Sequence, residues 1–373
     1  MNKVFKHISF LNTNYFGCFS RNRVFFALFL MILATISLQA QVLTNSGAAI
    51  SVSSTANISC SDFNNNTGSI SNNGKVYMTG NWNNSSTHTP GAGTVGFNGT
   101  GNQYMNNSSG ETFNKLVVAN SGGSGKRVKL NNRVTIDTSV TVSSGVLQID
   151  TGNFINKGIT EVSGTIIDSS VTGKDLFKGL VTVKLGGTWD FTPSNTVVEY
   201  QGGLLNAGTF KSGTGDYNFT SNPQSLTGTS AITFSGNVNV DGAVVTAGGT
   251  INMGCNGTNV FAIKSGSFNT ATSNFTAYAK TYLLTTLSDN NTSGSNLFAD
   301  SVIIKPTSAW NFSGGSNAEF HKGLNFYGSV FNSGTGSYIF NTNNQNIVGS
   351  SGISLDGPVS IGGITLTNKL PPA

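Results

Sequence analysis

Carboxylates and histidines are the side chains of this sequence that could cleave a bond or hold a metal ion. The fifteen acidic residues are scattered singly, and no two lie at i and i+2, the spacing that would place both on one face of a strand. Enzymes that cleave glycosidic bonds need two carboxyl groups close together. Stacked segments could bring Asp150 beside Asp168 (168 − 150 = 18), but isolated acids such as these are typical of solvated turns. We therefore expect no catalytic residues.

Metal and cofactor motifs give the same expectation. His88 lies in a Thr-rich stretch and His321 precedes Lys322, and neither has partners at the spacing of zinc ligands. Asp-rich calcium loops are absent from the sequence. The glycines of Gly213-Thr214-Gly215 precede a strand-like segment and lack the Lys-Ser/Thr of a phosphate-binding loop. No Gly-x-Ser-x-Gly segment has a plausible His partner, so the sequence predicts no metal, no cofactor and no enzymatic activity.

The three tryptophans could present flat surfaces to sugar rings. Trp82, Trp189 and Trp310 each follow a short strand-like segment, which indicates one shared structural role, covering the edge of the core at a corner. A glycan-contacting platform at these three positions is the less favoured alternative. That platform would require exposed indoles.

One sequence motif occurs three times in the chain, and its repetition indicates how the strands that carry the acids, histidines and tryptophans are arranged. Each copy has two glycines, then an apolar or aromatic pair, then an Asn-rich turn and a Gln. The first glycines are spaced by 213 − 91 = 122 and 334 − 213 = 121, so a unit of roughly 121 residues recurs. Such repetition is typical of stacked arrays. The copies are Gly91 to Phe97 with Gln103, Gly213 to Phe219 with Gln224, and Gly334 to Phe340 with Gln345.

Short apolar alternations separated by Asn, Gly and Ser predict strands and tight turns throughout residues 41–368. The pair Ile58/Cys60 recurs as Val76/Met78, and this spacing (76 − 58 = 18) suits one rung of a solenoid or part of one. Asn side chains in the turns can form ladders between neighbouring rungs. We expect Val95/Phe97, Tyr217/Phe219 and Tyr338/Phe340 to point inward. The predicted fold is an all-β parallel β-helix, or β-solenoid, of short strands with Asn/Gly-rich turns.

Composition and charge exclude several functions. Charged residues make up 9% of the chain, and good helix formers are sparse. Residues 1–40 carry four basic residues and no acid, so the remaining 20 − 4 = 16 basic residues nearly balance the 15 acids. No basic stripe suited to nucleic acid is present, and we expect no nucleic-acid partner.

The N-terminus resembles an export signal. Residues 24–36 form an apolar run after Arg21 and Arg23, and Ala40-Gln41 is a plausible cleavage point. The run is too short to span a bilayer comfortably, so we expect a signal peptide at 1–40, the only helix, and no transmembrane helix in the mature chain. Cys60 and Cys255 then remain, and residues so far apart in a solenoid should stay unpaired thiols.

Two stretches carry a family resemblance. The segments from Asn81-Trp82-Asn83-Asn84 to Val118 and from Trp310-Asn311-Phe312 to Ile353 resemble the Gly/Asn/Thr-rich repeat regions of Bacteroidetes-type surface proteins. This resemblance implies a right-handed parallel β-helix with an adhesin-like role, exported by the type IX system. The C-terminal sorting domain of that family is missing, so residues 369–373 are expected to begin a linker or mark a truncation, with downstream modules of the same polypeptide.

The resulting functional expectation is an exported, rigid display or adhesion scaffold of the cell surface. Its expected partners are surface glycans or other cell-surface proteins. The alternatives are a carbohydrate-binding protein, favoured by exposed tryptophans, and a polysaccharide-degrading β-helix, favoured by a cleft that gathers three or more charged side chains. Ice binding would need a flat Thr array, and the irregular rung lengths count against it.

Overall fold

The computed structural model describes residues 41–371 except residues 124, 151, 222, 255–257 and 272–273. The chain divides into two units, Met1–Ala40 and Gln41–Ala373, and the second unit contains all described residues. The predicted signal peptide at 1–40 and the thiol of Cys255 lie outside the described residues.

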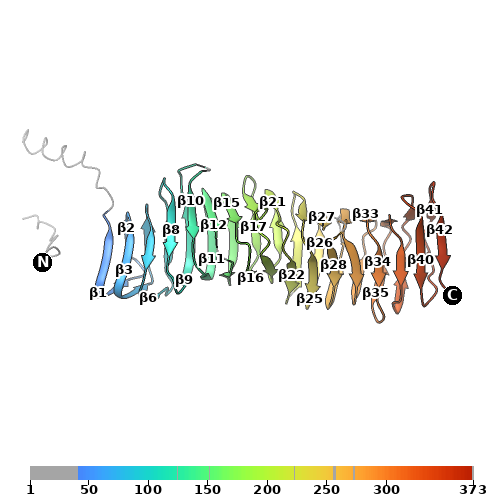
Figure 1. The fold of residues 1–373 in the computed structure, drawn as a ribbon, viewed down its shortest axis with the longest axis horizontal. Coiled ribbons are helices and arrows are strands. Elements are labelled where there is room, and N and C mark those ends of the chain that lie inside the picture. Colours follow the sequence, from blue (N-terminus) through green and yellow to red (C-terminus); the bar gives the residue numbers. More distant parts are fainter. Residues whose placement is uncertain are drawn as a thin grey trace, which may run out of the picture. The chain divides into compact units, whose positions relative to one another are not determined.

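Residues 41–371 form a parallel β-solenoid of about 15 turns, and no helix occurs in this described part. Figure 1 shows the strands stacked side by side, with β1 and β42 at opposite ends of the stack. Most turns contribute strands to three rows, and most strands pair in parallel with their equivalents one turn away. The first row is divided into two sheets, one ending at β21 (Thr209–Lys211) and the other beginning at β24 (Ile232–Phe234). The all-β parallel solenoid predicted from the sequence is thus confirmed.

The three rows contain all the strands of the described part. Row one contains β1 (Leu43–Val52), β3 (Phe63–Asn72), β5 (Trp82–Asn84), β8 (Gln103–Asn106), β10 (Arg127–Leu130), β12 (Val146–Ile149), β15 (Thr165–Asp168), β18 (Thr188–Asp190), β21 (Thr209–Lys211), β24 (Ile232–Phe234), β27 (Thr250–Met253), β30 (Asn274–Ala277), β33 (Ser295–Phe298), β36 (Asn317–Phe320), β39 (Tyr338–Phe340) and β41 (Val359–Ile361). Row two contains β6 (Thr87–Thr89), β9 (Glu111–Ala119), β11 (Val134–Ser144), β13 (Phe154–Asn156), β16 (Lys174–Phe177), β19 (Val197–Tyr200), β22 (Tyr217–Thr220), β25 (Val238–Asp241), β28 (Val260–Ile263), β31 (Lys280–Leu283), β34 (Val302–Ile304), β37 (Leu324–Phe326), β40 (Gln345–Gly349) and β42 (Leu366–Lys369). Row three contains β2 (Asn57–Cys60), β4 (Lys75–Met78), β7 (Thr94–Phe97), β14 (Ile159–Val162), β17 (Val181–Val183), β20 (Leu204–Asn206), β23 (Pro223–Thr227), β26 (Ala243–Gly248), β29 (Gly266–Asn269), β32 (Thr286–Asp289), β35 (Ala309–Phe312) and β38 (Val330–Asn332).

Four long strands cross a corner. Strands β1 and β3 continue from row one into row two, whereas β9 and β11 continue from row two into row three.

The register shows how much sequence makes one turn. Ile58 pairs with Val76, so the predicted spacing of these two residues is one complete turn. Other turns are longer, since the paired residues Gln103 and Val128 are further apart in the sequence. Turn length therefore varies along the stack, because the loops between strands absorb the difference.

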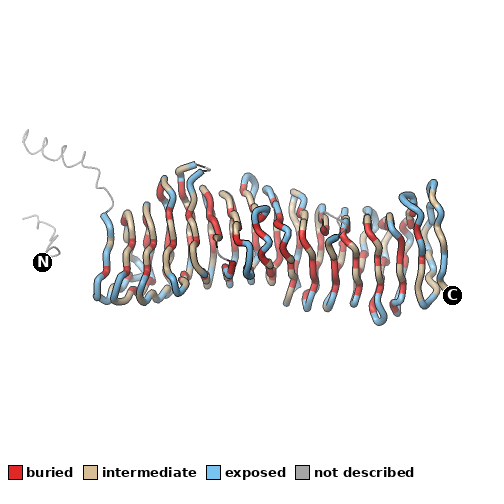
Figure 2. Tube along the Cα trace, in the orientation of Figure 1, coloured by how far each residue is buried: buried red, intermediate tan, exposed pale blue. Residues whose placement is uncertain are grey.

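The core runs along the inside of the stack and is built from alternating residues of each strand. Figure 2 shows buried positions recurring along the strands between exposed ones. The pairs Val95/Phe97, Tyr217/Phe219 and Tyr338/Phe340 are each at most 1% exposed, which confirms their inward orientation. Aromatic rings also stack from turn to turn: in row two the rings of Tyr200 and Phe219 lie 5.5 Å apart at 17°.

The long repeat does not equal a whole number of turns. Its three aromatic or aliphatic pairs lie in β7, β22 and β39, which belong to rows three, two and one. From one copy of the repeat to the next, the chain therefore completes a whole number of turns and then passes through two more rows. Equivalent residues occupy different rows for this reason.

The repeated glutamine has one structural role in all three copies. Gln103 Nε2 donates to Met78 O at 3.0 Å, Gln224 Nε2 to Tyr200 O at 2.8 Å, and Gln345 Nε2 to Phe320 O at 2.6 Å. Each acceptor is the last residue of the strand one turn below the repeated pair. The buried amide therefore ties each corner to the strand end one turn below, and at Met78 O it is a second donor beside the Asn98 N–H at 2.9 Å.

The second repeated glycine permits close approach of successive turns. A Cβ atom at Gly93, Gly215 or Gly336 would lie 2.5, 2.0 or 1.9 Å from a backbone carbonyl oxygen of the turn below. No other residue type fits in that space without moving the backbone. The motif is thus a corner lock made of a glycine and a glutamine.

Candidate functional site

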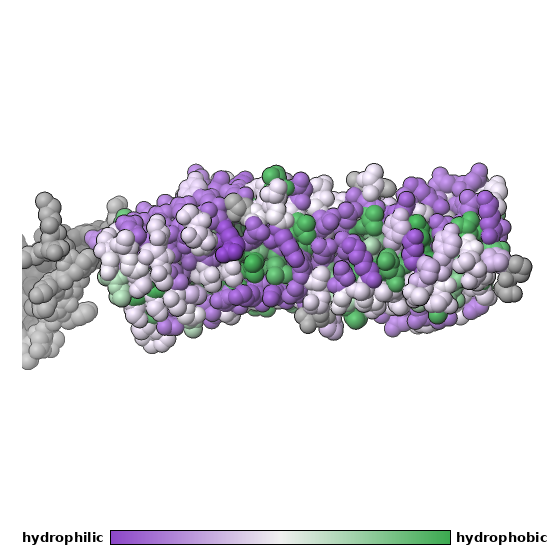
Figure 3. All heavy atoms as spheres, turned by 60° about the horizontal axis from the view of Figure 1, so that its bottom comes forward, coloured by the Kyte–Doolittle hydropathy of each residue, from purple (hydrophilic) through white to green (hydrophobic). Residues whose placement is uncertain are grey.

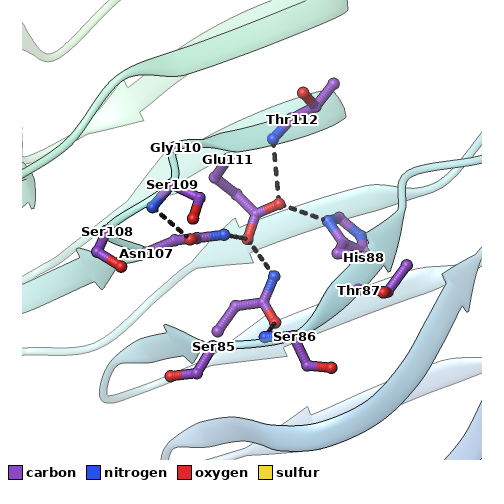
Figure 4. Close-up of a pocket in the computed structure, with 11 residues that line it drawn as sticks. Ser85, Ser86, Thr87, His88, Asn107, Ser108, Ser109, Gly110, Glu111 and Thr112 are labelled. Atoms are coloured by element: carbon purple, nitrogen blue, oxygen red, sulfur yellow. Dashed lines mark hydrogen bonds and ion pairs between the residues drawn. The ribbon is translucent and has the colours of Figure 1, made fainter.

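A surface hollow of about 380 Å³ lies where two loops of neighbouring turns meet. One loop, Asn84-Ser85-Ser86, joins β5 to β6, and the other, Asn107-Ser108-Ser109, joins β8 to β9. In each loop the Asn Oδ1 accepts the backbone N–H two residues later at 3.1 Å, a local turn that Asn favours. Figure 4 shows these hydroxyl and amide groups around Glu111.

Glu111 is buried beneath the hollow and joins both loops. Its Oε2 accepts hydrogen bonds from Trp82 Nε1 and Asn84 Nδ2, both at 2.8 Å, and from Asn107 Nδ2 at 3.3 Å. Its Oε1 lies 2.9 Å from His88 Nδ1 and accepts the Thr112 N–H at 3.0 Å. Both carboxylate oxygens are therefore fully used inside the protein.

The pKa of Glu111 is lowered by these contacts. Burial alone would raise it, but the hydrogen bond and charge of His88, helped by Asn84 and Trp82, outweigh that effect. The carboxylate is consequently held in its charged form as a structural acceptor.

A ladder of buried asparagines leads to this carboxylate. Asn45 Nδ2 donates to Asn65 Oδ1 at 2.8 Å, and Asn65 Nδ2 donates to Asn84 Oδ1 at 2.8 Å. Asn84 then donates to Glu111, so the ladder crosses three turn-to-turn steps and ends on a group that only accepts. The ladder predicted from the Asn-rich turns is confirmed, and its carboxylate end is a new finding.

The pairing of His88 with Glu111 resembles part of a hydrolytic triad, but its geometry does not activate a nucleophile. His88 Nε2 is buried without a hydrogen-bonding partner in the described part of the chain. The imidazole packs against the rings of Trp82 and Phe113, at 5.0 and 5.7 Å. Ser86 Oγ instead donates to Gly68 O at 2.6 Å. The pair therefore braces the two loops.

The tryptophans do not form a glycan platform. Trp82, Trp189 and Trp310 are each 0% exposed, so the less favoured alternative of glycan contact at these residues lacks the exposed indoles it requires, and the three side chains are structural. They also occupy two rows rather than one slot, since Trp82 and Trp189 lie in row one and Trp310 in row three. What they share is a stacked phenylalanine: the ring centroids lie 4.3, 4.4 and 4.2 Å from those of Phe63, Phe191 and Phe312. Trp189 and Trp310 lie two residues before their phenylalanines and so share the inward side of the chain with them, whereas Trp82 pairs in register with Phe63 one turn below.

Asp150 and Asp168, both expected to be solvated turn residues, differ in their burial. Asp168 pairs in register with Ile149, and Asp150 accepts a hydrogen bond from Ser169 Oγ at 2.7 Å. The carboxyl of Asp150 is 25% exposed, whereas Asp168 is 0% exposed. Asp168 is therefore not a solvated turn residue, and its partner is the buried Asp175 rather than Asp150.

Charged pairs on the surface connect consecutive turns. Lys157 Nζ lies 2.8 Å from Asp137 Oδ1, and Lys184 Nζ lies 2.8 Å from Glu161 Oε1. His321 Nε2 lies 2.8 Å from Glu319 Oε1 within one turn. Across the described ranges no group of three or more His, Cys, Asp or Glu is placed to hold a metal ion.

Cys60 is a buried free thiol. Burial, and then the charge of Asp62, raise the pKa of the Cys60 thiol to about 11. Within the described ranges, no helical segment could span a lipid bilayer.

Comparison of the chain with known proteins gives no match to a family model, a curated protein or a solved structure.

Sequence reasoning missed the Glu111 centre, although a signal for it existed. The triplet Asn-Ser-Ser occurs at both 84–86 and 107–109, one turn apart in the structure. Glu111 also alternates with Phe113, the pattern that predicts an inward side chain.

Proposed function

We propose that this chain is an exported, non-enzymatic scaffold of the cell surface that acts as a stiff display or adhesion rod. The observation that carries the proposal is the continuous stacking of turns from β1 to β42 over one internal core. With about 15 turns spaced by about 4.8 Å, the rod is about 70 Å long. A structure of this kind separates its two ends by a fixed distance.

The surface of the rod suits many weak contacts. Figure 3 shows a mainly hydrophilic face with small separate apolar areas. Charged residues make up only 9% of the chain, and six lysines of the described residues pair with an acid of a neighbouring turn, as Lys157 does with Asp137. Ser, Thr and Asn groups are therefore the main groups available to a partner, and dispersed contacts of this type gain strength through multivalency.

The export pathway in this proposal is taken from the resemblance to Bacteroidetes-type repeat proteins. The chain would leave the cell by type IX export after cleavage at Ala40-Gln41, as a right-handed β-helix attached to further modules. Its partners would be surface glycans or other cell-surface proteins. The hollow between the two Asn-Ser-Ser loops favours the carbohydrate-binding alternative, because hydroxyl and amide groups line it. Its site would then be this hollow and not the tryptophans.

Export and adhesion are tested on the full chain produced in a Gram-negative host with type IX secretion. We expect export from the cytoplasm with Gln41 as the first residue, and arrival on the outer surface when the chain is joined to a C-terminal sorting domain of the type IX family. Beads carrying many copies should bind glycan or cell-surface arrays much better than the free protein does. Retention in the cytoplasm with residues 1–40 intact, or depolymerisation of a polysaccharide by the purified protein, would contradict the proposal.

Two loop variants separate the hollow from the rest of the surface. Ser109→Lys places a long side chain in the hollow, and Ser293→Lys places one on an exposed loop with a similar Asn contact. If the hollow is the glycan site, Ser109→Lys alone should abolish glycan binding. Equal binding by both variants would assign adhesion to the dispersed polar faces.

A further inference from the structure

Two buried aspartates lie within interaction range of each other at the corner between rows one and two, where the charge and side chain of Asp168 act on Asp175. Asp168 is the last residue of β15, Asp175 is the second residue of β16, and both are 0% exposed. The Oδ1 of Asp168 accepts the Ser170 N–H at 2.8 Å, and its Oδ2 accepts a hydrogen bond from Ser194 Oγ at 2.6 Å. Asp168 is thus well supplied with donors as a carboxylate.

Asp175 is supplied with donors on one side only. Its Oδ1 accepts the Phe154 N–H at 2.9 Å. Its Oδ2 is buried and accepts no hydrogen bond from any described residue. A charged carboxylate in that place would leave an oxygen unsatisfied in the core, which is costly.

No basic side chain compensates this pair. In the described part of the chain, no Lys, Arg or His forms an ion pair with either aspartate. Lys174, next to Asp175, faces outward to Glu199. The titratable groups that act on the pair from the strands above are Tyr200 of β19 and Tyr217 of β22, both of which are buried.

The long repeat contains a second copy of this corner in which one aspartate is replaced. Asp289 and Asn296 lie one long repeat further on (289 − 168 = 121 and 296 − 175 = 121), and they also end one strand and begin the next. The main-chain contact is retained, since Asp289 Oδ1 accepts the Asn291 N–H at 2.8 Å. Asn296 Nδ2 donates to Asp289 Oδ2 at 2.6 Å. In the second copy, the position of Asp175 is therefore occupied by a hydrogen-bond donor.

We propose that Asp168 and Asp175 form a buried proton-binding site, in which neutral Asp175 donates its proton to the Asp168 carboxylate. A carboxyl group can replace the Asn296 amide as a donor only when it carries a proton. Release of that proton would place two charges together in the core and loosen the solenoid at this turn. Burial, and then the charge and hydrogen bond of Asp168, raise the pKa of Asp175 well above its usual range, in agreement with this assignment.

The pH dependence follows from the direction of this shift. The unfolded chain loses the Asp175 proton at about pH 4, whereas the folded chain retains it to a higher pH. The folded state therefore binds one more proton throughout this window, and rising pH favours unfolding. The stabilisation is complete below the unfolded pKa and is lost as pH rises through the folded pKa. Within the window the local unfolding constant increases about tenfold per pH unit.

The experiment compares the full-length chain with Asp175→Asn and Asn296→Asp between pH 4 and pH 10. Hydrogen-exchange protection is measured for strands β15, β16, β32 and β33, after correction for the intrinsic exchange rate. The wild type should lose protection at β15 and β16 with rising pH, relative to Asp175→Asn. Asn296→Asp should create the same pH-dependent loss at β32 and β33.

Two controls keep the proposal open to refutation. Asp137→Asn removes a surface carboxylate that pairs with Lys157, and it should leave the profile of β15 and β16 unchanged. Addition of calcium or of a chelator should have no effect, whereas a change in protection would identify a cation in place of the proton and overturn the proposal. Equal pH profiles for the wild type and Asp175→Asn would also overturn it. If Asp175→Asn fails to fold, a flat profile at β32 and β33 in Asn296→Asp decides against it.

Discussion

Removal of the Glu111 carboxylate should open the N-terminal part of the solenoid. In Glu111→Ala, the buried donors Trp82 Nε1 and Asn84 Nδ2 both lose the acceptor that lies 2.8 Å away. A buried donor left without a partner costs about 1–3 kcal/mol, so the two together cost about 2–6 kcal/mol. The Asn ladder also loses its terminal acceptor, so the effect should extend to the turns below.

Hydrogen exchange resolved by peptide is the suitable measurement, because a repeat protein of this length need not unfold in one step. Protection should fall in β3, β5, β8 and β9 and remain unchanged beyond β15. The matched control is Glu319→Ala, which removes a Glu–His pair whose side chains are 26% and 22% exposed. An exposed pair contributes about 0–1 kcal/mol, so that variant should resemble the wild type.

Acid should reproduce part of the Glu111→Ala effect in the wild type. Because the pKa of Glu111 is lowered in the fold, its stabilising contribution is present above the unfolded value of about 4.3 and is lost as pH falls through the folded pKa. Glu111→Gln should remove this acid sensitivity. The reasoning is refuted if Glu111→Ala costs no more than Glu319→Ala, or if protection is lost evenly along the whole stack.

Two further predictions concern the corner lock and the buried thiol. Gly215→Ala should destabilise the surrounding turns by about 1–3 kcal/mol, because the added Cβ would lie 2.0 Å from Thr196 O. Gly101→Ala is the control, because no atom lies within 4 Å of its added Cβ, and it should leave the free energy of unfolding in urea nearly unchanged. Cys60 should react with a thiol reagent at pH 8 only on unfolding, since its pKa of about 11 leaves about one thiolate in a thousand; rapid labelling that Cys60→Ser removes would contradict its burial.

The sequence predicted the parts of the fold that depend on local alternation. Strand pairs such as Tyr217/Phe219 are inward because side chains alternate across a strand, and this holds whichever turn lies above. The recurrence of Ile58 as Val76 was visible because that turn has short loops. The same alternation could have placed Asp168 beside Ile166 on the inner face, where the structure has it.

Contacts between turns were not predictable in the same way. His88 and Glu111 meet because the loops at 85–86 and 107–110 set the length of the turn that separates them. Turn length differs between the pairs Ile58/Val76 and Gln103/Val128, so no single spacing identifies which residues face each other. The proximity of Asp168 and Asp175 could not be predicted for a related reason. A corner separates the two residues, and the alternation along a strand does not show where a side chain beyond a corner points.

The mismatch between the long repeat and the turn has a consequence for any duplicated feature of this protein. Copies of the long repeat trace a steep spiral around the long axis, so a partner that lies straight along one side meets a given motif only once. Growth by duplication of this unit would therefore lengthen the molecule without producing an ordered line of identical docking points. Because each copy of the long repeat lies in a different row, the repeated residues must fit the surroundings of all three rows. Only structural roles that the three rows share, such as those of the glycine and glutamine of the corner lock, can recur in every copy.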